Sequence, residues 1–274
     1  MLKKLCLHTI TNRPWTIEEC AKHYSEVGIG GITLWRYNLE GRKPKAVGNS
    51  LRDAGLSIVS FCRGGFFPAK TVEARQAAID DNLRTIDDAA ALGAPLIVLV
   101  CGAVIGKSLE DSRKEITEGI AAILPHAKAC GVKLGIEPLH PMYADDRSAI
   151  NTLGQAHDVI DALGSPPEVG ITADVFHIWW DPKLDTDLLL AGEKDRLFSF
   201  HLCDWKTPMA DMLNDRGLPG EGCIPLRSIQ KTVKQAGFTG FEEIEIFSER
   251  YWKMDQSEFL KKVIESYQIL AGGE

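Results

Sequence analysis

The sequence predicts an α/β fold, a single (β/α)8 barrel that spans residues 1–274. Short apolar runs alternate with longer helical patterns, and a glycine recurs where a helical pattern turns into the next strand. This alternation implies a parallel sheet. Eight strand–helix units also suit a chain of 274 residues, because such barrels usually contain about 250 residues.

The expected strands are short apolar runs at residues 5–11, 31–35, 57–62, 95–101, 133–137, 169–174, 197–201 and 242–247. Eight helical patterns follow them in turn, at residues 16–27, 44–54, 71–92, 109–130, 152–163, 184–191, 225–236 and 256–270. An open doubly wound sheet is the competing arrangement. No GxGxxG motif follows the first strand, and this absence argues against the dinucleotide-binding type of doubly wound sheet.

Several helix ends carry the expected chemistry. Thr16, followed by Glu18 and Glu19, favours a helix start, because a hydroxyl caps free amides and acidic groups complement the helix dipole. Glycines that can adopt a left-handed conformation follow four helical patterns, at Gly93, Gly131, Gly164 and Gly237.

Composition narrows the class of protein. With 45% hydrophobic and 25% charged residues, the chain resembles an ordinary globular protein that buries a large core. The net charge of −7 argues against a nucleic-acid partner, because such proteins usually carry a basic face. The apolar runs are too short for a signal peptide or a membrane span, so no membrane association is expected.

Seven cysteines are scattered along the chain without a CxxC pair. An odd, unpatterned set of this kind indicates reduced and buried thiols, so the expected location is the cytoplasm.

Four polar residues stand at or near the ends of four consecutive expected strands: Glu137, Asp174, His201 and Glu245. Their spacings of 37, 27 and 44 residues each match one strand–helix unit. In a parallel barrel all strands deliver their last residues to one face, so we expect these side chains to meet there. Carboxylates and an imidazole together predict a site for one divalent metal ion: Mn²⁺, Mg²⁺, Co²⁺ or Zn²⁺.

Each of these residues also has a simpler explanation. Glu137 could cap a loop before Pro138, Asp174 could cap the next helix, and His201 could be a hydrogen-bonded core histidine. Glu243 competes with Glu245, because strand alternation points both the same way. We choose Glu245, which lies nearer the strand end, and expect Glu243 to pair inside the barrel.

Five stretches in this region together resemble a known family: LGIEPLHP (134–141), ITADVFHIW (171–179), FSFHLCDW (198–205), DRGLPGEGCIP (215–225) and GFEEIEIFSERYW (240–252). In this order and at these separations, the chain resembles the xylose-isomerase-like TIM barrels over nearly its whole length. This group contains sugar isomerases, epimerases and inosose-processing enzymes, and is related to apurinic endonuclease IV.

The resemblance implies that the metal is held by the same four residues and that Glu137 and Glu245 move a proton. It also implies that His177 and Arg216 bind substrate oxygens, although a polar loop histidine and an exposed loop arginine are the alternatives. The implied activity is isomerisation or epimerisation of a keto-sugar or inosose through an enediolate. The resembling enzymes are often dimers or tetramers, so a homo-oligomer is compatible with the resemblance.

The same residues are compatible with other functions to different degrees. A dehydratase acting on an inosose or keto-sugar would share the metal and the proton abstraction. A phosphodiesterase of the endonuclease IV type needs additional histidines at the ends of strands two to four, and this chain has none there. A binding protein that has lost catalysis is the third alternative, and the complete ligand set argues against it.

Overall fold

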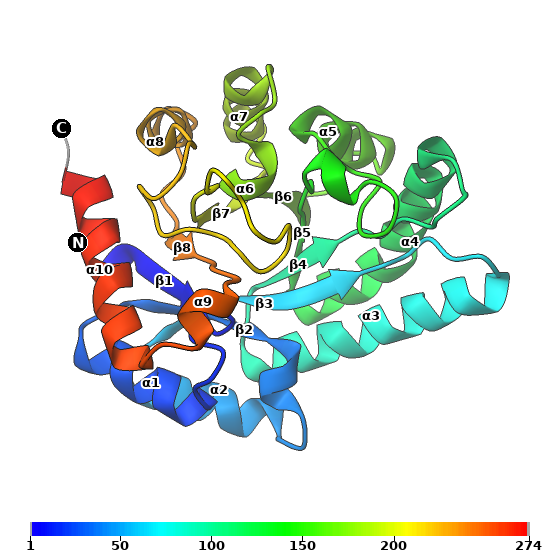
Figure 1. The fold of residues 1–274 in the computed structure, drawn as a ribbon. Coiled ribbons are helices and arrows are strands. Elements are labelled where there is room, and N and C mark those ends of the chain that lie inside the picture. Colours follow the sequence, from blue (N-terminus) through cyan, green and yellow to red (C-terminus); the bar gives the residue numbers. More distant parts are fainter. Residues whose placement is uncertain (1, 273–274) are drawn as a thin grey trace.

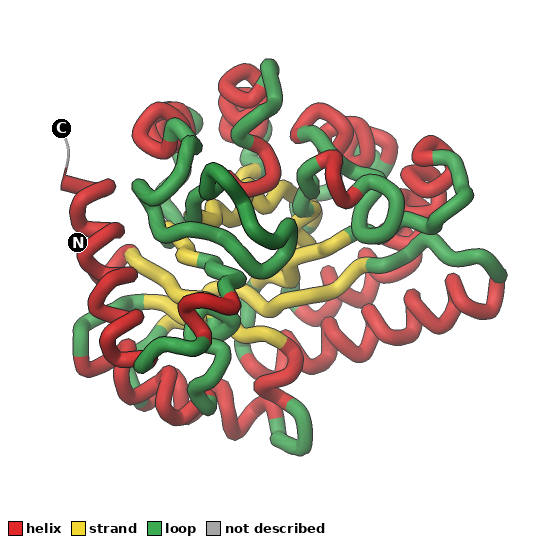
Figure 2. Tube along the Cα trace, viewed as in Figure 1, coloured by secondary structure: helices red, strands yellow, loops and turns green. Residues whose placement is uncertain are grey.

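The computed structural model describes residues 2–272, and its eight parallel strands close into a barrel in sequence order. Helices form a ring outside the strands (Figures 1 and 2). The predicted (β/α)8 barrel is therefore confirmed. The strands are β1 (Leu5–His8), β2 (Gly31–Trp35), β3 (Ser57–Gly65), β4 (Leu96–Val100), β5 (Lys133–Ile136), β6 (Val169–Asp174), β7 (Leu197–Leu202) and β8 (Glu242–Ile244).

All eight expected helices are present. The structure also contains separate short helical elements. The α-helices are α1 (Ile17–Glu26), α2 (Pro44–Asp53), α3 (Val72–Leu92), α4 (Leu109–Cys130), α5 (Leu153–Ala162), α6 (Val175–Ile178), α7 (Leu184–Glu193), α8 (Leu226–Gln235), α9 (Glu249–Trp252) and α10 (Gln256–Gly272). The 3₁₀ turns are η1 (Leu2–Lys4), η2 (Arg36–Leu39) and η3 (Pro141–Tyr143). The four-residue helices α6 and α9 were not predicted, because one turn is too short to show a hydrophobic period.

Helix α1 begins as the sequence indicates. The Thr16 hydroxyl accepts a hydrogen bond from the Glu19 backbone at 3.2 Å, and the Glu19 carboxylate accepts one from the Thr16 backbone at 2.8 Å. This reciprocal capping box pairs two amides that the helix itself leaves free.

Strands β1 and β8 both end earlier than predicted, and the Thr11 side chain accounts for both early ends. The chain turns after His8, where the Thr11 N–H donates to the His8 carbonyl at 2.9 Å. The Thr11 hydroxyl then donates to the Ile244 carbonyl and accepts from the Ile246 N–H, both at 3.1 Å. A hydroxyl thus replaces the backbone partner that a longer ladder would have supplied.

Strand β3 is longer than predicted. The predicted strand ends at residue 62, but Gly65 still pairs with Val100 of β4. The Asn82 side chain accepts from the Gly65 N–H at 2.7 Å and donates to the Gly65 carbonyl at 2.8 Å. Gly65 has a φ of +106°, and a Cβ there would lie 2.0 Å from the Val100 carbonyl oxygen, so glycine is required.

The core lies between the barrel wall and the ring of helices, and it is built from aliphatic and aromatic side chains of both layers. Five of the seven cysteines are buried free thiols, whereas Cys130 is half-buried and Cys223 is exposed. The prediction of buried thiols is therefore wrong for Cys223. Within residues 2–272, no helix combines the length and the apolar character that a membrane crossing requires.

Candidate metal centre and substrate cavity

The structure brings together the four residues that the sequence singled out. Asp174 ends β6 and His201 lies in β7, whereas Glu137 and Glu245 directly follow β5 and β8. Backbone hydrogen bonds extend the ladder to the two glutamates, from Glu137 to Leu99 at 3.1 Å and from Glu245 to Leu202 at 3.2 Å. All four side chains are buried, and one possible ligand atom from each lies within 4.8 Å of the others.

Part of this cluster has no hydrogen-bond partner. Among the described residues, Glu137 Oε1 and both ring nitrogens of His201 are buried without one. His201 Nδ1 lies 3.4 Å from Glu137 Oε1. Unpaired buried polar atoms are costly unless a ligand satisfies them. Three carboxylates and one imidazole fit a divalent cation of the Mn²⁺, Mg²⁺, Co²⁺ or Zn²⁺ kind.

Asp174 uses its two oxygens for different purposes. Its Oδ1 accepts from the Phe176 N–H at 2.8 Å and caps α6. Its Oδ2 accepts from Arg216 Nη1 at 2.8 Å. The helix-cap explanation for Asp174 is therefore correct, and it leaves the second oxygen facing the cluster.

Arg216 is buried, so the alternative explanation, that it is an exposed loop arginine, is wrong. Its Nη1 also donates to Glu245 Oε2 at 2.9 Å, and its Nη2 lies 3.1 Å from Nε2 of His177. The guanidinium is packed against the rings of Phe176 and Phe247, whose centroids are 4.3 and 5.0 Å away. Two carboxylates and two aromatic faces thus fix an arginine that comes from a loop.

His177 contacts the same cluster from helix α6. Its Nδ1 accepts from the His140 backbone at 3.2 Å. Burial and then the neighbouring Arg216 charge hold the pKa of His177 well below its usual value. His177 is therefore neutral at pH 7. Because its Nδ1 accepts from the His140 N–H, its Nε2 carries the proton and can donate to a ligand.

His8 was left without a role by the sequence, yet it is central to the cluster. Its Nδ1 lies 2.9 Å from Glu245 Oε1, and its Nε2 lies 3.1 Å from Glu243 Oε2. Burial lowers the pKa of His8, but Glu245 and the other neighbours outweigh this and raise it well above the usual value. His8 follows the apolar run of the first strand, which is the same signal that identified the other four residues.

The two glutamates are perturbed in opposite directions. Burial raises the pKa of Glu137. Burial also opposes ionisation of Glu245, but His8 and Arg216 more than compensate and hold its pKa well below the usual value. The two environments therefore shift the pKa values of Glu137 and Glu245 apart, although both residues follow strands of the same barrel.

Glu243 lies one layer deeper, inside the barrel. Its Oε2 accepts from the Thr33 hydroxyl at 2.6 Å and from His8, and its Oε1 accepts from the Ser199 hydroxyl. Burial raises the pKa of Glu243, but His201 and His8 reverse this and lower it to about 2. The expectation that Glu243 pairs inside the barrel is confirmed.

A cavity of about 290 Å³ opens above the cluster. Glu137 and Glu245 line it, whereas Asp174 and His201 are fully buried and are not among its lining residues. Of the aromatic residues at strand ends, Trp35 lines the cavity, together with two that the sequence did not single out, Tyr143 and Phe247. The other lining residues are Arg63, Val100, Leu139, Arg147, His177, Leu213 and Arg216.

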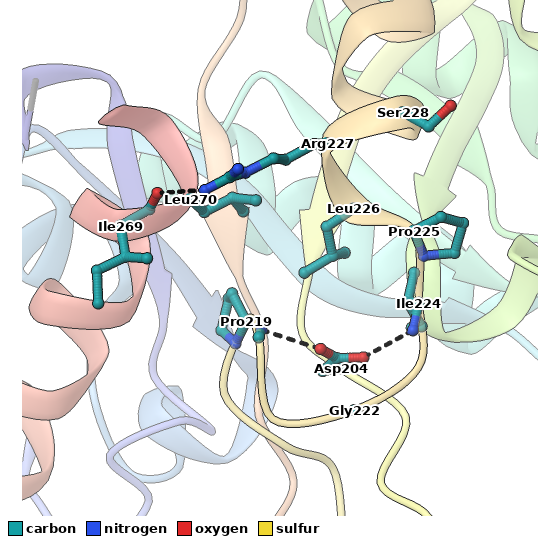
Figure 3. Close-up of a pocket in the computed structure, with 11 residues that line it drawn as sticks. Asp204, Pro219, Gly222, Ile224, Pro225, Leu226, Arg227, Ser228, Ile269 and Leu270 are labelled. Atoms are coloured by element: carbon teal, nitrogen blue, oxygen red, sulfur yellow. Dashed lines mark hydrogen bonds between the residues drawn. The ribbon is translucent and has the colours of Figure 1, made fainter. Parts of the chain in front are cut away.

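The loop between β7 and α8 carries Arg216 and is fastened by Asp204. The buried Asp204 carboxylate accepts from the backbone N–H groups of Trp205, Gly220 and Ile224 at 2.8, 2.9 and 3.0 Å. Two of these bonds are drawn as the dashed lines that meet at Asp204 in Figure 3. Asp204 also pairs through its backbone with Gly217, the residue next to Arg216. A second cavity, of about 420 Å³, lies beside Asp204 between α8 and α10, away from the cluster (Figure 3).

We expect Asp204→Ala to loosen this loop, because it leaves the three N–H groups without their acceptor. The free energy of unfolding should fall by about 2 kcal/mol, and the melting temperature by about 4–8 °C. Hydrogen–deuterium exchange should rise in peptides from residues 203–225 and stay unchanged in β4. Asp53→Ala, at an exposed helix end, is the control, and equal exchange in the two variants would contradict the role of Asp204.

Comparisons with known proteins agree with this architecture. A family model described as xylose isomerase-like TIM barrel matches residues 21–266. An inosose isomerase from Bacillus velezensis is 24% identical, over 97% of this chain and 96% of the relative. An inosose isomerase from Halalkalibacterium halodurans is 28% identical, over 64% of this chain and only 61% of the relative. A fructoselysine 3-epimerase from Shigella flexneri is 22% identical, over 89% of this chain and 90% of the relative.

Two solved structures are similar over nearly their whole length. Protein SMc04130 from Sinorhizobium meliloti 1021 is 42% identical with a TM-score of 0.94, covering 98% of this chain and 99% of that one. The IOLI protein, solved with a bound zinc atom, is 20% identical with a TM-score of 0.84, covering 97% of each chain. At that identity the second similarity concerns the fold alone.

Proposed function

Because this chain belongs to the xylose isomerase-like TIM barrel family, we propose that it is a divalent-metal-dependent isomerase or epimerase of a keto-sugar or inosose. Its curated relatives are isomerases and epimerases, and the chain is an enzyme of this type. The finer assignment, to proton transfer through an enediolate at one metal site, is our proposal.

One observation carries the proposal. Four buried potential ligands meet within 4.8 Å at the ends of neighbouring strands, and two of them, Glu137 and Glu245, also form the wall of the cavity. The cluster combines the oxygen and nitrogen donors that a divalent cation needs with two carboxylates that a substrate can reach. We therefore assign Glu137, Asp174, His201 and Glu245 as the metal ligands.

The bound cation would supply a Lewis acid that polarises neighbouring carbonyl and hydroxyl oxygens of the substrate. Glu137 and Glu245 reach the cavity from different strands, so one carboxylate can remove the proton from the hydroxyl-bearing carbon next to the carbonyl and the other can return it. Return to the opposite face of the same carbon gives the epimer. Return to the former carbonyl carbon, with a proton passing from the hydroxyl of the first carbon to the oxygen of the second, gives the isomer.

Arg216 and His177 are assigned to binding substrate oxygens. Both line the cavity, and the guanidinium is a fixed group of hydrogen-bond donors. His177 is neutral and can donate to an oxygen that gains negative charge. The apolar walls of Trp35 and Phe247 suit the hydrophobic face of a sugar ring, and they limit access of water to the carbon that loses its proton.

Proton abstraction can be tested directly by incubating ketoses and inososes in D₂O with the manganese-loaded enzyme. We expect deuterium to enter the carbon next to the carbonyl of at least one compound, and mass spectrometry with proton NMR locates it. Removal of the metal with a chelator should abolish the exchange, and added Mn²⁺ should restore it.

The outcome separates the possible reactions. Deuterium in an epimer or an aldose supports the proposal, whereas deuterium with loss of water identifies a dehydratase. Full exchange in chelated, metal-free enzyme would contradict the metal assignment. No exchange in any ketose or inosose would contradict the proposed function.

A further inference from the structure

Two arginines in the cavity lack an acidic partner. Arg63 and Arg147 both line the same cavity as Glu137 and Glu245. Neither guanidinium has a carboxylate within 4.0 Å or a hydrogen bond among the described residues 2–272. Arg36, nearby, differs: its guanidinium makes hydrogen bonds of 2.6 and 2.9 Å to Asp81.

Arg63 stands at an irregularity of β3, and it lines this cavity and also another one that contains Phe66 and Asp81. Strand β3 changes register against β4 between Cys62 and Gly64, so Arg63 is the extra residue of a bulge. A bulge bends its strand and redirects the side chain at that point. The guanidinium lies 4.2 Å from the centroid of the Phe66 ring, which supports it from one side.

Arg147 reaches the same cavity from the loop after β5. Its carbonyl accepts from the Gly102 N–H at 2.9 Å, and its N–H donates to the Tyr143 carbonyl at 3.0 Å. The adjacent Ser148 forms a bridge with Gly102. These bonds tie the loop to the end of β4, so the position of Arg147 is set by the barrel rather than by a free loop.

The two positive charges oppose each other. Burial, followed by the charge of Arg147, lowers the pKa of Arg63. Two half-buried guanidinium groups that share one cavity repel each other unless an anion lies with them. Carboxylate and phosphate are the anions whose oxygens match the guanidinium fork.

We propose that Arg63 and Arg147 form an anion subsite, and that the natural substrate is a keto-sugar bearing a carboxylate or a phosphate. The inference rests on the proposed function, because it places the reacting carbon at Glu137 and Glu245 and the anionic group at the arginines. A cavity of about 290 Å³ suits a single sugar unit, since small-molecule sites begin at about 300 Å³. One sugar can therefore reach both ends of the cavity.

Equilibrium binding tests the subsite without requiring turnover. Calorimetry on the manganese-loaded enzyme compares fructose with fructose 6-phosphate and with 5-keto-gluconate. We expect at least one anionic compound to bind about tenfold more tightly than fructose, because hydrogen bonds to charged groups are the strong ones. The phosphate and carboxylate arms show which anion the subsite prefers.

The readout is the ratio of the fructose dissociation constant to that of the anionic compound, measured within each variant. Arg63→Ala and Arg147→Ala should each reduce the ratio about threefold, and the double variant should bring it close to one. The Gln variants, which keep more of the side chain, should do the same if an Ala variant does not fold. Arg250→Ala is the control. This exposed arginine has no ion pair among residues 2–272, so the variant should keep the full ratio and the full exchange rate.

Two results would overturn the subsite: a ratio near one in the unaltered enzyme, or a high ratio that persists in the double variant. The second result would mean that the anion binds elsewhere, such as at the metal. A high ratio that depends on the arginines, without deuterium exchange in any compound, would instead overturn the proposed reaction and leave the subsite standing.

Discussion

Replacing Glu245 with glutamine is expected to lower the rate of deuterium exchange into the substrate by about 10²–10⁴-fold. This is the usual contribution of a positioned acid or base, and an amide cannot accept the proton. Glu245 lines the cavity and contacts His8 at 2.9 Å and Arg216 at 2.9 Å, so its position is fixed by two cationic groups.

Two measurements keep this test specific. Circular dichroism and thermal unfolding show whether the barrel still forms, and elemental analysis shows whether the metal is retained. Glu249→Gln, four residues further along in an exposed position, should exchange at the original rate. If Glu245→Gln also exchanged at the original rate, Glu245 could not be the group that moves the proton.

The largest loss of stability is expected for Glu243→Ala. This carboxylate is 1% exposed, and it accepts hydrogen bonds from Thr33, Ser60, Ser199 and His8. Removing one member of a buried charged network typically costs about 3–5 kcal/mol, because the remaining partners stay buried without compensation. For a chain of this size we expect the melting temperature to fall by about 10 °C or more.

Thermal unfolding in the presence and absence of Mn²⁺ measures this effect. Glu265→Ala, on the exposed side of α10, provides a surface control that should change the melting temperature little. If the two variants melted at the same temperature, the interior network around Glu243 would have no stabilising role.

The sequence is most informative about features that recur in every strand–helix unit. Strand–helix alternation and glycines such as Gly93 and Gly131 predict the barrel, because each signal recurs in several units. Glu137 and Asp174 could be identified because a carboxylate after an apolar run contradicts the pattern around it. His8 carries the same signal, and applying the rule to every strand would have included it.

Other features depend on contacts that local patterns do not contain. Strands β1 and β8 end early because the Thr11 hydroxyl bonds to the neighbouring strand, more than 230 residues away in sequence. Arg147 belongs to the cavity because its loop is tied to Gly102. Neither pairing leaves a periodic signal, so only the folded chain reveals them.

The ion pairs of Arg216 and His8 have a practical consequence for studying this enzyme. These two cations already pair with Asp174, Glu245 and Glu243, so mutual repulsion of the carboxylates is reduced during folding even without a metal. A preparation stripped with chelator should therefore stay intact and accept manganese, magnesium, cobalt or zinc in turn. Metal preference can then be ranked on a single batch of protein, free of differences between expression cultures.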